Sequence, residues 1–330
     1  MRLGFAPSRR AAGELIADGR VRVNGRRIRK GETLASGDRV EVVDLPAAIA
    51  LAPDPDLKIA ILFADAAVIV AAKPPLVPCH PLRPGERATV MNAIVAAYPE
   101  TAQAGEKALE GGLVHRLDNG TSGALMVARN RVAFATIRDA LRAGRITRNY
   151  RALVAGRLDA TIEIANAIAH HQKNPRKMVV VHTVDTVEKV DTVVTPDSFH
   201  VDGVAGTFDD APIAPLASTS NRYRSSPRPA LTRVEPLSYV GGFTLVQVTP
   251  RTGNRHQIRV HLASIGNPLA GDSLYGGPPL DGLEHGRFWL HLAELEFDSP
   301  AGGRVRVTAP LASDLEASLA RLRPPGARDR

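Results

Sequence analysis

A polar, glycine-containing turn that runs into an apolar segment is the feature that most constrains how this chain folds. Residues 115–118 read His-Arg-Leu-Asp, residues 119–123 read Asn-Gly-Thr-Ser-Gly, and the run from Ala124 to Ala128 is apolar. An apolar run of this length, bounded by turn residues, is typical of a buried strand. Asp118 at the mouth of that strand, with Arg116 two residues before it, is a candidate nucleophile or base. The alternative is a surface turn in which Asp118 only caps its own backbone.

Composition narrows the class of protein. With 330 residues, the chain can build one sizeable core and a small accessory domain. No stretch approaches the roughly 18 uncharged apolar residues of a membrane span, and the N-terminus lacks the apolar core of a secretory signal. Cys79 is the single cysteine, which rules out an internal disulfide and favours a reducing cytoplasm. We therefore expect a cytoplasmic protein without a membrane segment, and we expect it to be a monomer.

The chain is basic, and its first residues are especially so. The net charge is +8, which favours a polyanionic partner. Residues 1–44 hold ten Lys or Arg against six Asp or Glu. Ser8 is a good N-cap for a helix over residues 9–17, and Asn24-Gly25 is a strong hairpin signal between two short strands. We predict a small domain over residues 1–46 with a phosphate-binding face, whose residues are Arg9, Arg10, Arg20, Arg22, Arg26 and Arg27. A solvated basic hairpin is the alternative.

The rest of the chain divides by composition. Residues 47–57 are rich in Ala and Pro and are predicted to be a linker, followed by a second domain over residues 58–323 that contains the candidate residue Asp118. Helical spacing over residues 131–143 and alternation over 148–154 predict a helix and then a strand, and residues 243–248 predict another strand. Residues 184–226 carry seven acids against three bases and no clear periodicity, so we interpret them as an insertion.

Several motifs resemble one family. The pattern HRLDxxTSG at residues 115–123 resembles the active-site signature of the large-subunit-type (RluA-type) RNA pseudouridine synthases. Lys73-Pro74, His80-Pro81 and residues 148–154, 249–277 and 287–292 resemble its other segments. Leu76 stands where the family usually has Gly, and Asn254 stands where it usually has Arg, with Arg255 next to it. Residues 8–28 resemble the alpha-L RNA-binding domain, which also occurs in a small-subunit ribosomal protein.

The resemblance implies a fold and a set of roles. The fold is α+β, with a mixed, largely antiparallel central sheet. The reaction is the isomerisation of uridine in ribosomal or transfer RNA to pseudouridine. Asp118 is the implied nucleophile or base, Arg259 pairs with it, and Tyr150 stacks on the uracil. Arg116 fills the space left by the flipped base, Leu290 lines the pocket, and the remaining implied substrate-binding residues are Thr121, Arg255, His256 and Gln257.

Neither a cofactor nor a metal is expected. No GxGxxG follows a predicted strand, no P-loop occurs, and Cys79-His80 has no further ligand at metal-binding spacing. Two rival functions stay open. One is a catalytically silent RNA-binding or ribosome-assembly protein on the same fold. The other is a glycosidase-like hydrolase, which needs a second acid near Asp118, although Asp139 lies among arginines on the following helix. The residues alone do not choose the RNA, or the atom that Asp118 attacks.

Overall fold

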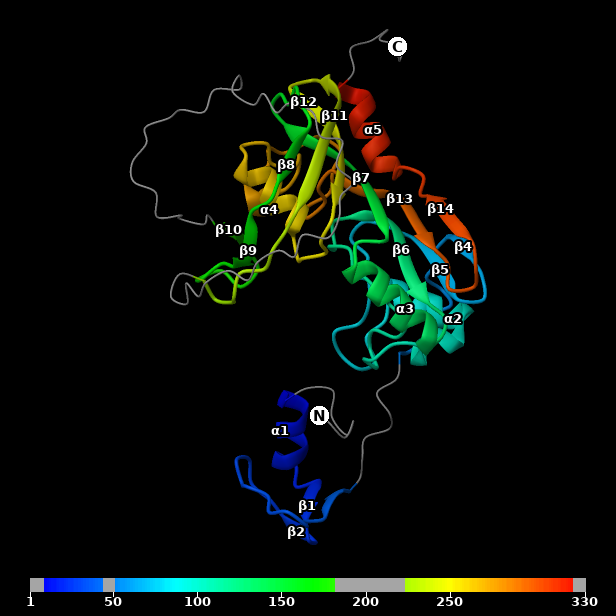
Figure 1. Cartoon of the computed structure of the whole chain (residues 1–330), viewed down its shortest axis with the longest axis vertical. Helices are drawn as coiled ribbons and strands as arrows, with labels where there is room; N and C mark the ends of the chain where they lie inside the picture. Colours follow the sequence, from blue (N-terminus) through cyan, green and yellow to red (C-terminus); the bar gives the residue numbers. More distant parts are fainter. Residues whose placement is uncertain (1–8, 44–50, 182–222, 323–330) are drawn as a thin grey trace, which may run out of the picture. The chain divides into compact units, whose positions relative to one another are not determined.

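A computed structural model describes residues 9–43, 51–181 and 223–322 (Figure 1). The chain divides into two compact units. Unit 1 comprises Met1–Ile146 and Leu292–Ala312, and unit 2 comprises Thr147–His291 and Ser313–Arg330.

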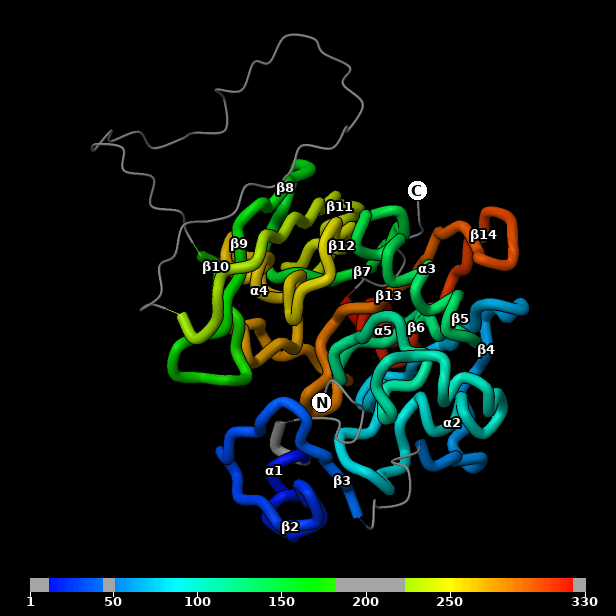
Figure 2. The backbone as a smooth tube through the Cα atoms, turned by 60° about the horizontal axis from the view of Figure 1, so that its bottom comes forward, coloured from blue at the N-terminus to red at the C-terminus, as the bar shows by residue number. Residues whose placement is uncertain are grey.

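The N-terminal part of unit 1 is a helix and a small sheet (Figures 1 and 2). Helix α1 (Arg9–Ala17) ends where Gly19 takes a positive φ of 68°, and the N–H of Arg20 reaches the carbonyl of Leu15. Strand β1 (Val21–Val23) lies between β2 (Arg26–Arg27) and β3 (Val40–Val42). The turn between β1 and β2 is Asn24-Gly25, with φ of 50° and 79°, so the predicted helix and hairpin are both confirmed.

The larger part of unit 1 is built on a sheet whose two central strands are almost entirely buried. The order is β4 (Ile61–Ala64), β5 (Val68–Lys73), β6 (Ser122–Ala128) and β13 (Leu290–Asp298), and β14 (Arg304–Thr308) pairs with β13. The pairs β4–β5, β5–β6 and β13–β14 are antiparallel. Every residue of β6 is buried, as its apolar run predicted. The remaining elements are α2 (Val90–Ala97), the short η1 (Pro99–Gln103) and α3 (Arg131–Arg142), which packs against β6.

The segment predicted to be a linker is packed in its described half. Leu51 is buried, Asn92 of α2 donates to the carbonyl of Ala52, and the N–H of Asp54 donates to the carbonyl of Asn92. The Asp54 carboxylate also accepts from the N–H of Ala88. Residues 51–54 therefore pack against the start of α2. Residues 44–50 lie outside the described ranges.

Four strands of unit 2 are paired in the order β7 (Thr147–Ala155), β12 (Phe243–Pro250), β11 (Thr232–Val240) and β8 (Ile162–Ile164). Their pairs are antiparallel. The unit also contains helix α4 (Gln257–Ser264), the short η2 (Ser273–Tyr275) and helix α5 (Ser313–Leu322). The predicted strands over residues 148–154 and 243–248 are confirmed as parts of β7 and β12.

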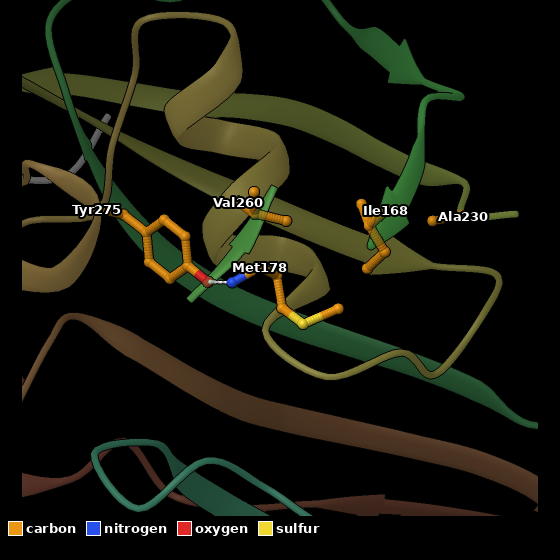
Figure 3. Packing of buried hydrophobic residues seen from close by; sticks show 5 residues of the cluster. All are labelled: Ile168, Met178, Ala230, Val260 and Tyr275. Atoms are coloured by element: carbon orange, nitrogen blue, oxygen red, sulfur yellow. Dashed lines mark hydrogen bonds between the residues drawn. The ribbon is translucent and has the colours of Figure 1, made fainter. Parts of the chain in front are cut away.

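A separate hairpin lies beside α4. Strands β9 (Ala167–His170) and β10 (Met178–Val181) pair with each other. Figure 3 shows the small core that joins this hairpin to α4, in which Ile168, Met178 and Val260 pack with Ala230 and Tyr275. The Tyr275 hydroxyl accepts a 2.8 Å hydrogen bond from the N–H of Met178. This contact fixes η2 to the hairpin.

The predicted insertion falls mostly outside the described residues, which omit 182–222. Its last residues, however, contact β9. The N–H of Arg224 donates to the carbonyl of His170, and the Ser225 hydroxyl lies 3.1 Å from both the His170 amide nitrogen and its ring Nδ1. Residues 223–226 therefore pack beside the β9–β10 hairpin.

The fold is α+β with largely antiparallel pairing, as predicted. Within the described ranges, no helix is long and apolar enough to cross a membrane.

Candidate active site

Asp118 stands on a tight turn that enters β6. The N–H of Thr121 donates to the carbonyl of Asp118 at 3.0 Å, which closes the turn. Asp118 is half-buried, whereas Leu117 before it and Thr121 after it are buried. At the start of β6, Gly123 has a φ of 119°, and a Cβ there would lie 2.2 Å from the carbonyl oxygen of Leu292. Only glycine fits this position, so the TSG of the motif has a steric reason.

A buried lysine, Lys73, forms hydrogen bonds with the backbone of this turn. Lys73, at the end of β5, is 2% exposed. Its ammonium donates to the carbonyls of Pro74 at 2.8 Å, Asn119 at 3.1 Å and Thr121 at 2.7 Å. A buried ammonium is stable only when its donors are satisfied, and here three carbonyl oxygens do so. Lys73 thereby fixes the backbone that carries Asp118 and adds positive charge beside it.

The segment after Lys73 is tied to the same turn. The N–H of Leu76 donates to the carbonyl of Asn119 at 2.8 Å. Leu76 has a φ of 61°, the left-handed region in which glycine is favoured. The family's usual glycine is thus replaced by a residue that keeps a left-handed backbone.

Cys79 makes a reciprocal contact with the motif. Its Sγ donates to the carbonyl of Leu117 at 3.3 Å and accepts from the N–H of Leu117 at 3.4 Å. Burial raises the pKa of the thiol. The buried, protonated Cys79 therefore acts as a backbone partner for the residue that precedes Asp118.

Arg116 lies beside His80. It is exposed, and its Nη1 lies 3.4 Å from Nε2 of His80. The Nδ1 of His80 lies 2.8 Å from the carbonyl of Pro81, and its Nε2 lies 3.8 Å from the carboxylate of Glu110. His115, by contrast, accepts the N–H of Met126 at Nε2, which is a structural role.

In unit 2, Arg259 on α4 is held on several sides. Its Nε and Nη2 bind the two carboxylate oxygens of Asp272 at 2.7 and 2.8 Å. Its guanidinium carbon lies 4.2 Å from the ring centre of Phe288 and 5.0 Å from that of Tyr275. Both members of the ion pair are buried. The pairing of Arg259 with Asp118 stays a prediction.

The residues before Arg259 shape the start of α4. His256 has a φ of 54°, and its Nδ1 lies 2.9 Å from the Tyr275 hydroxyl. Gln257 is buried, and its side chain binds Leu231, Thr232, Thr252 and Asn254. Arg255 is exposed and donates to the carbonyls of Pro175 and Arg176. The side-chain amide of Gln257 is therefore already hydrogen-bonded within the protein, whereas the side chain of Arg255 is exposed at the surface.

Asn254, the departure from the family pattern, has a structural role. Its Nδ2 donates to the carbonyl of Pro229 at 2.8 Å, and its N–H donates to the Gln257 side chain. Asn254 therefore links the loop before α4 to Pro229, which precedes strand β11.

Tyr150 and Leu290 are buried. Tyr150 lies on β7 opposite Val248 of β12, and Leu290 begins β13. The predicted site residues thus fall into two groups. Unit 1 holds Arg116, Asp118 and Thr121, and unit 2 holds Tyr150, Arg255, His256, Gln257, Arg259 and Leu290.

The predicted phosphate-binding face of the N-terminal part is largely accessible. Arg26 and Arg27 are exposed, and Arg20 and Arg22 are half-buried. The side chains of Arg9 and Arg10 lie outside the described ones. Among the described residues, no group of three or more His, Cys, Asp or Glu side chains could hold a metal ion.

Comparison with known proteins identifies the family. The sequence model described as RNA pseudouridylate synthase matches residues 67–264, more than half of the chain, and includes Asp118, Tyr150 and Arg259. The chain belongs to the RNA pseudouridylate synthase family. The model of the S4 domain matches residues 1–40, which confirms the RNA-binding domain inferred at the N-terminus.

Relatives agree with this family. An uncharacterized RNA pseudouridine synthase of Chloroflexus aurantiacus is 34% identical over 76% of this chain and 65% of its own length. One of Bacillus subtilis is 30% identical over 97% of this chain and 91% of its own. Ribosomal large subunit pseudouridine synthase D of Xanthomonas campestris is 29% identical over 97% of this chain and 86% of its own. These similarities support pseudouridine synthase activity, an isomerisation, and not the silent binding protein.

A solved structure shares the fold. Human RNA pseudouridylate synthase domain containing 1 superposes with a TM-score of 0.53 at 23% identity, over 79% of this chain and 87% of its own.

Two of the residues that shape the site were missed by the sequence interpretation. Asp272 and Tyr275 both lie in the segment GDSLYG, which was noted as part of a motif, but nothing in the sequence paired them with Arg259. Lys73 was noted only as part of a Lys-Pro pair, although it is the buried support of the Asp118 turn.

Proposed function

We propose that this chain isomerises uridines of ribosomal large-subunit RNA to pseudouridine, with Asp118 as nucleophile or base. The observation that carries the proposal is the half-buried Asp118 on a turn held by buried Lys73, within the segment that matches the family model. The choice of RNA rests on relatives that are named ribosomal large subunit pseudouridine synthases.

The reaction sets the requirements of the site. The bond from ribose C1′ to uracil N1 must break, the base must turn without leaving, and a bond from C1′ to C5 must form while C5 loses its proton. A stacked uridine cannot be reached, so the nucleotide must be flipped out. An ionised carboxylate, a cation that keeps it ionised, and a flat side chain for the base meet these needs.

Each requirement has a proposed residue. Asp118 supplies the carboxylate, and Lys73 below its turn supplies positive charge. The carboxylate of Asp272 orients the guanidinium of Arg259. Arg259 is proposed to pair with Asp118 while both act on the same uridine. Tyr150 is proposed to stack on the uracil and Leu290 to line its pocket. Exposed Arg116, resting beside His80, is proposed to take the place of the flipped base.

Positive charge outside the site is proposed to hold the RNA backbone. Arg26 and Arg27 form one exposed group. A second group surrounds the β9–β10 hairpin, where burial and then the charges of Arg255, Arg228 and Arg224 lower the pKa of His170. The three arginines that contribute to this shift carry the positive charge that attracts phosphate.

The experiment is tritium release from RNA labelled at uridine C5. Wild-type protein should release tritium from ribosomal large-subunit RNA and leave transfer RNA unchanged. Asp118→Asn keeps the shape and removes the charge, so it should abolish release while RNA affinity is retained. Asp139→Asn is the matched control, because Asp139 is exposed and pairs only with Arg142 among the described residues.

Three other outcomes would contradict parts of the proposal. Turnover of the Asp118→Asn variant within about tenfold of wild type would remove Asp118 from the chemistry. Tritium release from transfer RNA alone would overturn the choice of RNA. Free uracil as product would indicate the hydrolase.

The setting of the enzyme is part of the proposal. We place it in the cytoplasm as a monomer, in keeping with a single buried cysteine. Fractionation of cells and sedimentation of the purified protein test these two statements.

A further inference from the structure

Arg148 differs from the other buried arginines of the described residues. Three arginines are buried there, and two of them face a carboxylate. Arg259 pairs with Asp272, and Arg287 pairs with Asp314. Arg148 is 7% exposed, and within the described part of the chain no ion pair includes it. A buried cation without an anion is costly, because the desolvation of the charge is not offset.

The hydrogen bonds of Arg148 are also incomplete. Its Nη2 donates to the carbonyls of Pro250 at 3.3 Å and Thr252 at 3.0 Å. Its Nε is buried and has no hydrogen-bond partner. A guanidinium offers five N–H groups, and a buried donor without an acceptor is rare in native proteins. The geometry therefore leaves part of the planar fork for an acceptor that the protein itself does not provide.

The loop in front of the guanidinium approaches it closely. Gly253 lies beside Arg148, and a Cβ at residue 253 would come within 3.1 Å of Nη1. Any larger residue would crowd the fork. The same loop carries exposed Arg251 and Arg255, so the acceptor enters a positive environment. Both features favour an anion.

The position of Arg148 on β7 indicates which anion. Arg148 and Tyr150 are both buried and are two residues apart on one strand, so their side chains leave the same face about 6.6 Å apart. That spacing is similar to the distance between a nucleotide's base and its own phosphate. Arginine is suited to phosphate, because its fork binds two oxygens at once.

We propose that Arg148 binds the phosphate next to the uridine that is flipped out, while Tyr150 meets the base. This inference rests on the proposed function, since it takes an RNA nucleotide as the ligand. Because Arg148 is buried, it serves a phosphate that enters with the extruded nucleotide, unlike the exposed cations that follow the RNA backbone. It is a binding residue for the flipped state.

The first test changes the RNA and leaves the protein intact. The RNA that releases tritium is prepared with a neutral methylphosphonate at the phosphate 5′ or 3′ of the target uridine. One of these substitutions should weaken wild-type binding about tenfold, the effect of a lost charged hydrogen bond. A methylphosphonate three nucleotides away is the control. Equal effects at all three positions would overturn the proposal.

The second test identifies the residue. Arg148→Met should bind the native RNA about tenfold less tightly than wild type does. The methylphosphonate that weakens wild-type binding should cause no additional loss of affinity in Arg148→Met. Arg148→Lys, which keeps the charge without the fork, should fall between Arg148→Met and wild type. Arg251→Met, which removes an exposed charge of the same loop, should keep the wild-type sensitivity. A methylphosphonate effect that is the same in wild type and Arg148→Met would show that another residue binds this phosphate.

A third test does not depend on turnover. Titration calorimetry compares uridine with uridine 5′-monophosphate and with uridine 3′-monophosphate, and wild type should gain about tenfold in affinity from one of the two phosphates. Arg148→Met should lose this gain while its melting temperature is checked separately. If no RNA releases tritium, the proposed function fails, yet this measurement still decides the phosphate site. No gain in wild type would overturn the proposal.

Discussion

Arg259 and Asp272 form a buried, two-point ion pair, with Nε–Oδ2 and Nη2–Oδ1 distances of 2.7 and 2.8 Å. The two residues are 13 positions apart in the chain, and the pair joins α4 to the segment before η2. The rings of Phe288 and Tyr275 lie against the same guanidinium. Arg259 thus has an orientation that the fold imposes before any substrate arrives.

Removing one partner of this pair should be costly. Arg259→Met leaves a buried Asp272 without its cation and should lower the free energy of unfolding by about 3–5 kcal/mol. Urea denaturation measures the change. The double variant Arg259→Met/Asp272→Asn should recover much of the stability, because it leaves no buried charge.

Turnover then separates structure from chemistry. If Arg259 acts on the substrate, the double variant should be stable but inactive in tritium release. Recovery of turnover together with stability would mean that Arg259 only supports the fold.

Leu76 tests the cost of the left-handed turn beside the motif. Leu76→Gly and Leu76→Ala both remove the side chain, but only glycine is relaxed at a φ of 61°. We expect Leu76→Gly to be more stable than Leu76→Ala by about 1–2 kcal/mol in urea denaturation. Equal stabilities would show that the segment rearranges when the side chain is lost.

His261 should make stability depend on pH. Burial lowers the pKa of His261, whereas a backbone hydrogen bond to Asn166 opposes the shift. The unfolded chain therefore binds a proton below about pH 6.5 that the folded state resists, so stability falls as the pH drops below that value. The loss is at most about 1.4 kcal/mol per pH unit.

Unfolding by urea at pH 7.5 and 5.5 measures this effect. His261→Gln should reduce the difference between the two pH values, and His285→Gln, at an exposed position, should not. The same difference in all three proteins would assign the pH dependence to other groups.

Deletion of residues 1–46 should weaken RNA binding and reduce the dependence of log affinity on log salt, because fewer phosphates are neutralised. The cut precedes buried Leu51, so the packing on α2 is retained and the remainder should melt near the wild-type temperature. Filter binding at several salt concentrations provides the measurement. An unchanged slope would show that the S4 domain does not contact this RNA.

Replacement of residues 184–222 by a short Gly/Ser linker should preserve folding and turnover. Residues 223–226 are kept because Arg224 and Ser225 bind His170. Each doubling of loop length changes stability by only about 0.6 kcal/mol, so the melting temperature should move by a few degrees at most. Failure to fold would show that the replaced residues contribute to the core.

Local patterns predicted the local elements well. Asn24-Gly25 readily adopts the positive φ angles that a two-residue hairpin turn requires, and the alternation on β7 and the apolar run of β6 reflect how each strand is buried. These features depend on neighbours in sequence. The family resemblance predicts Asp118 as the reactive acid, and it does not show which residues support the turn on which Asp118 lies.

The features that were missed depend on distant residues. Lys73 binds carbonyls of residues 46 and 48 positions away, which no local pattern reveals. Leu51 lies in an Ala- and Pro-rich stretch typical of a linker, yet it is buried near α2. Asp272 becomes the partner of Arg259 only when α4 and η2 are packed together.

The contact between Cys79 and Leu117 provides a natural reporter for the motion of the Asp118 turn. Cys79 is the single cysteine of the chain, and it is buried against the peptide that precedes Asp118. A thiol reagent can modify it only after this contact opens. The rate of alkylation of the unlabelled wild-type enzyme therefore measures how often the contact between Cys79 and Leu117 opens. A slower rate with RNA present would show that bound RNA keeps this contact closed.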